Sequence, residues 1–353
     1  RKSNTPDGGE KRMLYTSKDQ VKLSQDARQY PTGDWAYVKY DELGRTVEFG
    51  LCEGCENISQ AALDDNSFPD RGSQVLSDIT TTYYDEAYDP TFAADNLRTR
   101  VAAATREDDE GDYVTTQVYD YDDHGNVKKT RTYLVGFGNF ELEYEYDLIS
   151  GKVNRANYQK GRPDYFAHRY TYDGDNRLIK AETTRDNVFW DRDGRYFYYP
   201  HGPLARLEIG QDNVQGNDHY YSIHGWIKGV NMPEYRSVQQ DPGKDGDISV
   251  STNDDMWVAR DAFAYHLGFY DGDYNPIGAN LVNNFGTLGT VWSDLSPHLL
   301  GLQGQGKGLF NGNIALMVTD LPDHAHVSGN GFINEGIANA YQYDQLNRIK
   351  KMR

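Results

Sequence analysis

The 353-residue chain has little cysteine, a shortage of basic side chains and no long hydrophobic run, and each shortage excludes a class of protein. The two cysteines, Cys52 and Cys55, cannot form a framework of several disulfides or the paired knuckles of a structural zinc site. A formal net charge of −18 argues against sequence-independent nucleic-acid binding, which depends on basic surfaces. No apolar run approaches the roughly 18 residues of a membrane-spanning helix, and no signal peptide is visible.

Motifs of catalysis are also missing. The sequence contains no Gly-x-Ser-x-Gly, no phosphate-binding loop and no His-Glu-x-x-His, and no two carboxylates stand out for glycoside hydrolysis. His324 and His326 are the only pointer to a metal site, and Pro322 together with the nearby glycines predicts an exposed loop there. We therefore expect no catalytic residue, no cofactor and no bound metal.

Tyrosine and glycine are abundant, with 28 and 35 residues, and they form a repeat. The pattern is Tyr-x-Tyr-Asp-x-x-(Gly/Asn)-(Arg/Asn/Lys), with Val38 at the first position of one copy and an extra residue in another. Internal repeats with a period of about 20–50 residues indicate an array of one supersecondary unit. The five copies lie at residues 38–45, 119–127, 144–153, 170–178 and 341–349, and degenerate copies lie at 198–207 and 220–229.

The repeat predicts a β-hairpin. Tyrosines at i and i+2 share one face of a strand, and the aspartate after them can begin a turn by bonding its own backbone. The glycine or asparagine three residues later suits a left-handed conformation, which a short hairpin loop requires. The residues assigned to the turns are Tyr40, Asp41, Gly44, Arg45, Tyr121, Asp122, Gly125, Tyr146, Asp147, Gly151, Tyr172, Asp173, Asn176, Arg177, Tyr343, Asp344, Asn347 and Arg348.

This repeat resembles the YD repeat of RHS (rearrangement hotspot) proteins, whose relatives include toxin-complex shell subunits and animal teneurins. The resemblance implies an all-β fold in which stacked antiparallel hairpins form a spiralling sheet, part of a hollow shell around a polypeptide. The chain lacks the core segment and the variable toxin with which bacterial RHS proteins commonly end. Further stretches are similar to RHS proteins from Bacteroidota, at residues 190–193, 198–206, 224–231, 267–273 and 310–314.

The repeats also predict how the chain is organised. Residues 93–106, rich in alanine, leucine and arginine, favour a short helix. The chain begins without methionine and stops inside a repeat with no capping unit, so we expect a fragment of a longer polypeptide. The expected parts are an entry segment or linker at 1–36, a hairpin array at 37–231, an interruption at 232–336 and a further repeat, truncated, at 337–353.

The cysteine pair leaves three interpretations open: a local disulfide, two free thiols or a metal ligand pair. An oxidising compartment favours a disulfide between Cys52 and Cys55. A thioredoxin-like active site would need a βαβ context, which the sequence does not predict.

The resemblance implies a non-catalytic shell segment of a large secreted or cell-surface protein, enclosing or presenting a C-terminal effector (toxin) that lies outside this chain. The expected partners are that downstream passenger and secretion or cell-surface machinery, without nucleic acid. Two alternatives remain. One is a surface adhesin whose exposed aromatic side chains bind glycans or other cells. The other is a carbohydrate-active or metal-dependent enzyme within residues 232–336.

Overall fold

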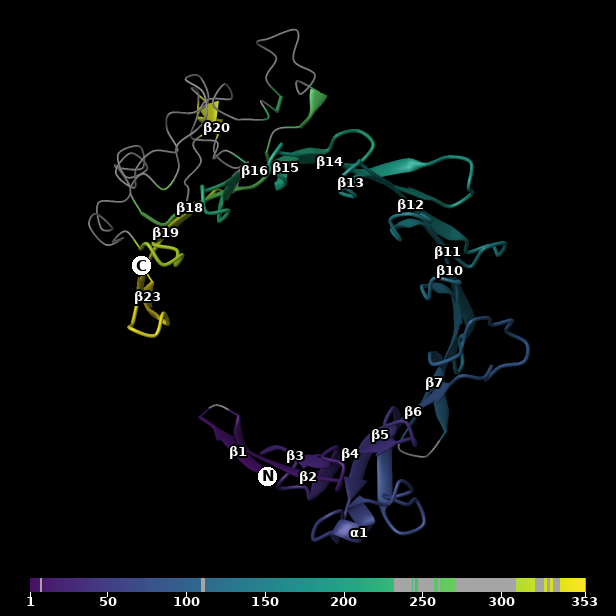
Figure 1. Ribbon diagram of the computed structural model, residues 1–353. Helices are drawn as coiled ribbons and strands as arrows, with labels where there is room; N and C mark the ends of the chain where they lie inside the picture. The colour runs from purple at the N-terminus through teal and green to yellow at the C-terminus, as the bar shows by residue number, and fades with distance from the viewer. Residues whose placement is uncertain are drawn as a thin grey trace. The chain divides into compact units, whose positions relative to one another are not determined.

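The computed structural model describes residues 1–6, 8–108, 112–231, 243, 245–246, 257–259, 261–270, 273, 309–320, 327–328, 331–332 and 337–352. These residues form 23 strands and one short helix, α1 (Gln60–Leu63), so the fold is all-β, as the repeat predicts (Figure 1). The chain divides into two compact units, Arg1–His168 and Arg169–Arg353. Within the described part, no helix is long and apolar enough to cross a membrane.

In the first unit, strands that are neighbours in the sequence are neighbours in an antiparallel sheet. Three of them lie within residues 1–36, the predicted entry segment. The strands are β1 (Lys2–Thr5), β2 (Gly9–Tyr15), β3 (Val21–Gln25), β4 (Asp34–Tyr40), β5 (Thr46–Glu53), β6 (Val75–Tyr84), β7 (Val101–Glu107), β8 (Tyr113–Tyr121), β9 (Val127–Leu134), β10 (Gly138–Tyr146) and β11 (Val153–Tyr158).

Antiparallel pairing in chain order also governs the second unit, where β18 and β19 continue the sheet from within the predicted interruption. Strand β19 then pairs with β22, and β22 with β23. The strands are β13 (Leu178–Thr184), β14 (Asp191–Tyr198), β15 (Leu204–Ile209), β16 (Gln215–Tyr221), β17 (Ile227–Val230), β18 (Ala264–Gly268), β19 (Leu316–Asp320), β22 (Ile337–Tyr343) and β23 (Ile349–Met352). Strands β20 (Val327–Ser328) and β21 (Gly331–Phe332) pair with each other, and β12 (Phe166–Tyr172) crosses the boundary between the units.

The two faces of the first unit's sheet differ in chemistry. Cross-strand partners share a face. One face of β9 and β10 carries ionic contacts, in which the Glu141 carboxylate accepts from Lys129 at 2.9 Å and from Arg131 at 2.8 Å. On β8 the same face carries buried Val118, which pairs with Arg131. The other face is aromatic and aliphatic, because the register aligns Tyr119, Thr130, Leu142 and Tyr158 in successive strands β8 to β11.

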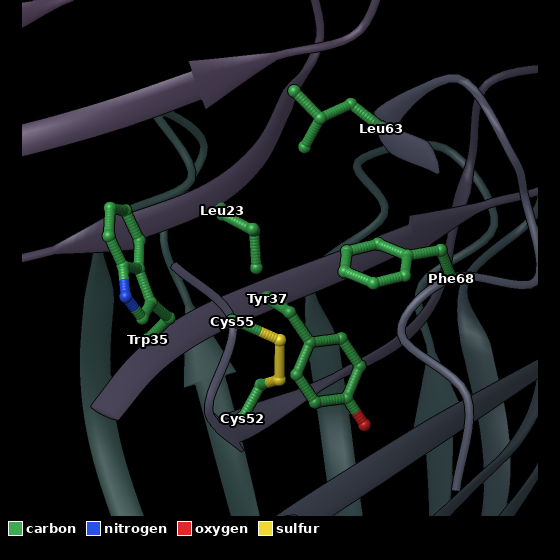
Figure 2. Close-up of a cluster of buried hydrophobic side chains, with 7 residues drawn as sticks. All are labelled: Leu23, Trp35, Tyr37, Cys52, Cys55, Leu63 and Phe68. Atoms are coloured by element: carbon green, nitrogen blue, oxygen red, sulfur yellow. A yellow bond between two sulfur atoms is a disulfide. The ribbon is translucent and has the colours of Figure 1, made fainter. Parts of the chain in front are cut away.

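A segment between β5 and β6, residues 54–74, folds over the sheet and covers its main hydrophobic core; we call it the first strap. Leu63 of α1 and Phe68 from this strap are buried against Leu23, Trp35 and Tyr37 of β3 and β4 (Figure 2). Burying a side chain of this size stabilises a fold by about 1.5–3 kcal/mol. The strap therefore stabilises the folded first unit through its buried side chains.

A second strap, residues 85–100, covers β7 and β8. Phe92 packs against Ala103 and Val118, and the Asp95 N–H donates to the Asp120 carboxylate at 2.7 Å. The helix predicted over residues 93–106 was wrong, since β7 begins at Val101 and the preceding residues form turns and irregular chain. Packing on the sheet outweighs the modest helix propensity of alanine and leucine.

Candidate functional site

The repeat turn has one geometry, seen clearly at residues 41–45. The Asp41 N–H donates to the Arg45 carbonyl at 2.9 Å, and the Gly44 N–H donates to the Asp41 carbonyl at 3.0 Å. The Asp41 carboxylate accepts from the N–H groups of Leu43 and Arg45 and from Arg45 Nε at 2.6 Å. One side chain therefore satisfies three donors and closes the turn.

Other copies use the same contacts. Arg177 Nε donates to Asp173 at 2.7 Å, and Arg348 Nε donates to Asp344 at 2.7 Å. Main-chain N–H donation from Arg177 and Arg348 holds the pKa of Asp173 and Asp344 below the ordinary value. In the copy at residues 119–127 the Asn126 amide replaces the guanidinium and donates to Asp122 at 2.9 Å.

The next-to-last residue of each turn is left-handed. In the five clear copies φ is 80° at Gly44, 93° at Gly125, 68° at Gly151, 62° at Asn176 and 61° at Asn347. Glycine and asparagine are the residues that adopt this conformation at least cost.

Two further turns of this geometry were missed from the sequence. At residues 16–20 the Thr16 N–H donates to the Gln20 carbonyl, and Asp19 takes the left-handed position. The other turn is split: the Asp85 N–H donates to the Arg100 carbonyl, with the second strap inserted between them. The signal for it was present, because Tyr84-Asp85 and Arg100-Val101 are the two halves of one repeat.

The degenerate copies have the same pair of main-chain bonds. The Tyr199 N–H donates to the Pro203 carbonyl and the Ser222 N–H to the Trp226 carbonyl, each at the first position of its turn. Gly202 and Gly225 are left-handed at the fourth position. The turn therefore depends on its backbone conformation more than on the aspartate.

In five of the turns, the tyrosine just before the turn ties that turn to the neighbouring strand. It is the last residue of its strand and lies at a β-bulge, as at Tyr40, Tyr121 and Tyr146. Its hydroxyl donates to the carbonyl of the first residue of the preceding strand; we call this contact the tyrosine clasp. The clasps are Tyr40 to Val21 at 2.8 Å, Tyr84 to Thr46 at 2.9 Å, Tyr121 to Val101 at 2.9 Å, Tyr146 to Val127 at 2.7 Å and Tyr198 to Leu178 at 2.7 Å.

In three clasps an arginine from the preceding turn also lies over the tyrosine ring. The guanidinium carbon is 4.2 Å from the ring centroid for Arg45 over Tyr84 and 4.7 Å for Arg177 over Tyr198. The third pair, Arg100 over Tyr121, is at 5.4 Å. A cation over an aromatic face is worth about 0.5–1 kcal/mol at an exposed site. The arginine of the repeat therefore serves two turns, its own and the next.

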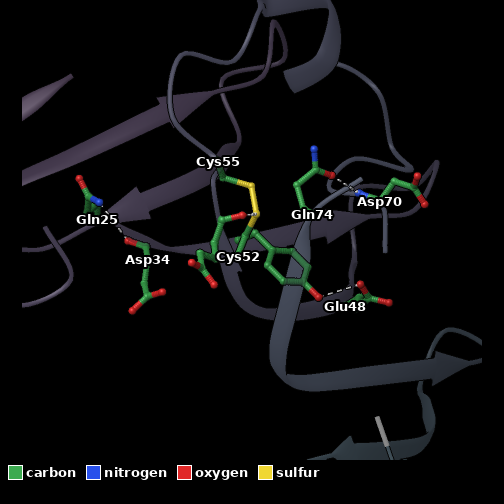
Figure 3. The surroundings of a disulfide bond; sticks show 9 residues. Gln25, Asp34, Glu48, Cys52, Cys55, Asp70 and Gln74 are labelled. Atoms are coloured by element: carbon green, nitrogen blue, oxygen red, sulfur yellow. Dashed lines mark hydrogen bonds between the residues drawn. A yellow bond between two sulfur atoms is a disulfide. The ribbon is translucent and has the colours of Figure 1, made fainter. Parts of the chain in front are cut away.

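Cys52 and Cys55 form a disulfide that joins the end of β5 to the start of the first strap (Figure 3). Both cysteines are fully buried in the core under that strap. At the other end of the strap, Arg71 donates two hydrogen bonds to the buried Glu107 carboxylate, at 2.8 and 3.0 Å. The strap is thus held at both ends.

The described part of the chain was expected to hold no metal site. Among these residues there is no group of three or more His, Cys, Asp or Glu side chains that could hold a metal ion. His324 and His326, the predicted pointers to a metal, lie outside the described residues. The features that recur among the described residues are the turn and the clasp, and both join neighbouring strands of the sheet.

Comparison with known proteins supports the fold. No family model and no curated protein matches the sequence. A crystal structure of TcdB2–TccC3 with Cdc42 aligns with 99% of this chain at a TM-score of 0.56 and 12% identity. The alignment covers 13% of that chain, so this chain corresponds to a small part of its neighbour.

The Photorhabdus luminescens Tc holotoxin pore, with a mutated TccC3, aligns with 99% of this chain and 19% of that chain, at 13% identity and a TM-score of 0.33. That score is too low to carry an argument. The first alignment supports the fold alone. The similarity to Bacteroidota proteins stays a prediction.

Proposed function

We propose that this chain is a non-catalytic wall segment of a larger secreted or cell-surface protein, and that the wall encloses a downstream effector domain. The observation that carries the proposal is the alignment of nearly the whole chain with a small part of TcdB2–TccC3. A segment that matches end to end inside a much longer chain suits a building unit of a longer protein.

The repeated clasp supports a wall in mechanical terms. Each clasp adds a hydrogen bond of about 0.5–1.5 kcal/mol net between one turn and the strand before it. Because each turn is bonded to the preceding strand, neighbouring hairpins separate less easily along that edge of the sheet. Such coupling suits a sheet whose curvature has to stay constant over many hairpins.

The difference between the sheet faces supports enclosure. An aromatic and aliphatic face, here Tyr119, Leu142 and Tyr158 in the first unit, offers contacts to a partly unfolded polypeptide without demanding a particular sequence. The opposite face, with the ionic contacts of β9 and β10 and the second strap over β7 and β8, would be turned outward. On this proposal the wall works by steric confinement, and no bond is made or broken.

The test uses the complete polypeptide from the gene that encodes this chain. Its intact mass and terminal peptides identify any downstream segment, and trypsin digestion measures how well that segment is protected. We expect the segment to be cleaved at least about tenfold more slowly in the complete protein than when produced alone, since cleavage requires opening of the wall. A double variant, Tyr121→Ala with Tyr146→Ala, should shorten this protection.

The matched control is Tyr133→Ala with Tyr113→Ala, two exposed tyrosines of the same sheet that form no clasp. Equal cleavage of the free and the wall-attached segment would contradict enclosure. So would a polypeptide that ends without any distinct downstream domain, and in that case binding of the chain to a glycan array would test the adhesin alternative.

A further inference from the structure

The first unit exposes a cluster of apolar side chains along the edge opposite the repeat turns; we call it the edge patch. Phe137, at the β9–β10 turn, is 79% exposed, and Val135 beside it is 53% exposed. Monomeric proteins rarely leave contiguous apolar side chains in water unless the surface has a use. The patch consists of Tyr88, Tyr113, Val114, Tyr133, Val135 and Phe137.

The members of the patch are neighbours in space. The Val135 N–H donates to the Val114 carbonyl at 3.2 Å, which joins the β9–β10 turn to the start of β8. The Tyr88 ring centroid lies 4.5 Å from that of Tyr83, and burial together with the neighbouring phenol of Tyr113 raises the pKa of Tyr88. Tyr133 pairs with Thr116 of β8, two residues along the strand from Val114.

This clustering distinguishes the patch from the exposed apolar side chains at the repeat turns of the first unit. Leu43 and the pair Leu148 and Ile149 lie at the tips of separate repeat turns on the opposite edge. A single exposed residue at a turn tip is ordinary. The edge patch, in contrast, combines three tyrosines, two valines and a phenylalanine.

The rim of the patch is acidic. Tyr113 directly follows a stretch, residues 107–112, in which five of six residues are Asp or Glu and none is basic. The Asp108 N–H donates to the Asp112 carbonyl at 2.9 Å, and Asp112 directly precedes Tyr113. Arg71 neutralises Glu107, but Asp112 is exposed.

We propose that the edge patch is a docking surface for a segment of another polypeptide that carries apolar side chains together with Lys or Arg. The apolar side chains would cover Val135 and Phe137 as a desolvated centre, and the basic side chains would lie over Asp112. An apolar centre with a charged rim is the usual anatomy of a protein interface. The proposal does not depend on the enclosure of a passenger, since it concerns the edge of the sheet and not its faces.

The test measures binding of a fluorescent synthetic peptide of about 12 residues with alternating Leu and Lys, by anisotropy at a physiological ionic strength of about 0.15 M. Matched peptides replace every Lys by Glu, or every Leu by Ser. We expect saturable binding of the Leu/Lys peptide alone. The double variant Val135→Ser with Phe137→Ser should weaken it at least tenfold, because it removes the anchoring side chains.

The matched control is Leu148→Ser with Ile149→Ser, which removes two exposed apolar side chains from the opposite edge. It should leave the affinity unchanged, and Asp112→Asn should weaken binding about two- to threefold and reduce its salt dependence. All of these residues are exposed, so circular dichroism should show an intact fold in every variant.

Three results would overturn the proposal. The first is no saturable binding of the Leu/Lys peptide up to about 1 mM, the weak end of specific recognition. The second is equal weakening by the patch and control variants, or equal binding of the Leu/Glu peptide. The third is concentration-dependent dimerisation, seen by light scattering, that the patch variant abolishes; a second copy of the chain would then be the occupant.

Discussion

Glycine and asparagine share the next-to-last position of the repeat turn because that position has a positive φ. At Gly151 φ is 68°, and a Cβ built there meets no atom within 4 Å. The restriction is therefore conformational and owes nothing to crowding. Asn176 and Asn347 adopt nearly the same φ in the equivalent turns, so asparagine can occupy this position without a change of backbone conformation.

Gly151→Ala should therefore lower the free energy of unfolding by about 1–2 kcal/mol, the cost of placing an ordinary L-residue in the left-handed region. Gly151→Asn should cost clearly less. Urea unfolding followed by tryptophan fluorescence measures both. Equal losses for the two variants would show that the position rejects any side chain, and that backbone conformation is not what selects glycine.

Lys22, on β3, has a side chain that is 1% exposed. Burial, and to a lesser degree the positive charge of Lys39, lowers the pKa of Lys22 from an ordinary 10.5 to about 8. Below pH 8 both the folded and the unfolded chain hold this proton, and the folded state carries the full desolvation penalty. Between about pH 8 and 10.5 the unfolded chain binds more protons, so stability rises with pH in that window.

Lys22→Met removes this dependence. The variant should be more stable than the wild type at pH 7, and its advantage should shrink by about 1–3 kcal/mol between pH 7.5 and 10.5. Urea unfolding across this range measures the difference, and Lys18→Met, at an exposed position, is the control. An advantage that stays constant with pH would mean that packing, and not the charge of Lys22, separates the two proteins.

At the scale of elements, the first strap shows how a segment without regular structure becomes part of the core. Its only regular structure is α1, capped by Ser59, whose side chain accepts from the Ala62 N–H at 3.3 Å. The rest is held by the disulfide, by buried Leu63 and Phe68, and by the Arg71–Glu107 pair.

Arg71→Ala should destabilise the first unit by about 1–3 kcal/mol, because the Glu107 carboxylate would stay buried without its two donors. Arg106→Ala is the matched control: its partner Asp78 is exposed, and exposed pairs contribute about 0–1 kcal/mol. Urea unfolding gives the stability, and chymotrypsin cleavage within residues 54–74 reports opening of the strap. Indistinguishable behaviour of the two variants would show that the buried pair does not hold the strap.

The sequence predicted the turns and failed on the straps for a physical reason. A turn is specified by residues within five positions, such as Asp173 and Arg177, so its pattern is visible in the chain. A strap is specified by contacts far along the sequence, such as Arg71 with Glu107 or Phe92 with Val118. The mistaken helix over residues 93–106 and the overlooked split repeat at Asp85 and Arg100 share this cause, since both lie where the second strap interrupts the pattern.

The sequence predicted the tyrosine of each clasp but not the hydrogen bond that its hydroxyl makes. The spacing of the tyrosines indicated a shared face, but the β-bulge at Tyr121 and Tyr146 turns that side chain along the edge of the sheet to reach a carbonyl about 20 residues earlier. A bulge changes which way one side chain points without changing the sequence pattern around it.

At the scale of the whole molecule, the sheet of the first unit is an array in which every strand pairs only with its neighbours in the sequence. The stability of such an array is a sum of unit and nearest-neighbour terms, so a local change should have local effects. The clasps are nearest-neighbour terms. This gives a prediction that distinguishes an array from an ordinary globular core.

Tyr121→Phe removes one clasp hydroxyl and keeps the ring. Amide hydrogen exchange should become up to about tenfold faster in β7, β8 and β9, the equivalent of a hydrogen bond of about 1 kcal/mol, and should stay unchanged in β2–β4. Tyr133→Phe, on exposed Tyr133, is the control and should alter neither region. Uniform acceleration throughout the first unit would mean that it unfolds as a single cooperative core. No acceleration anywhere would mean that the clasp does not couple the strands. The mechanical argument for a wall would then be wrong.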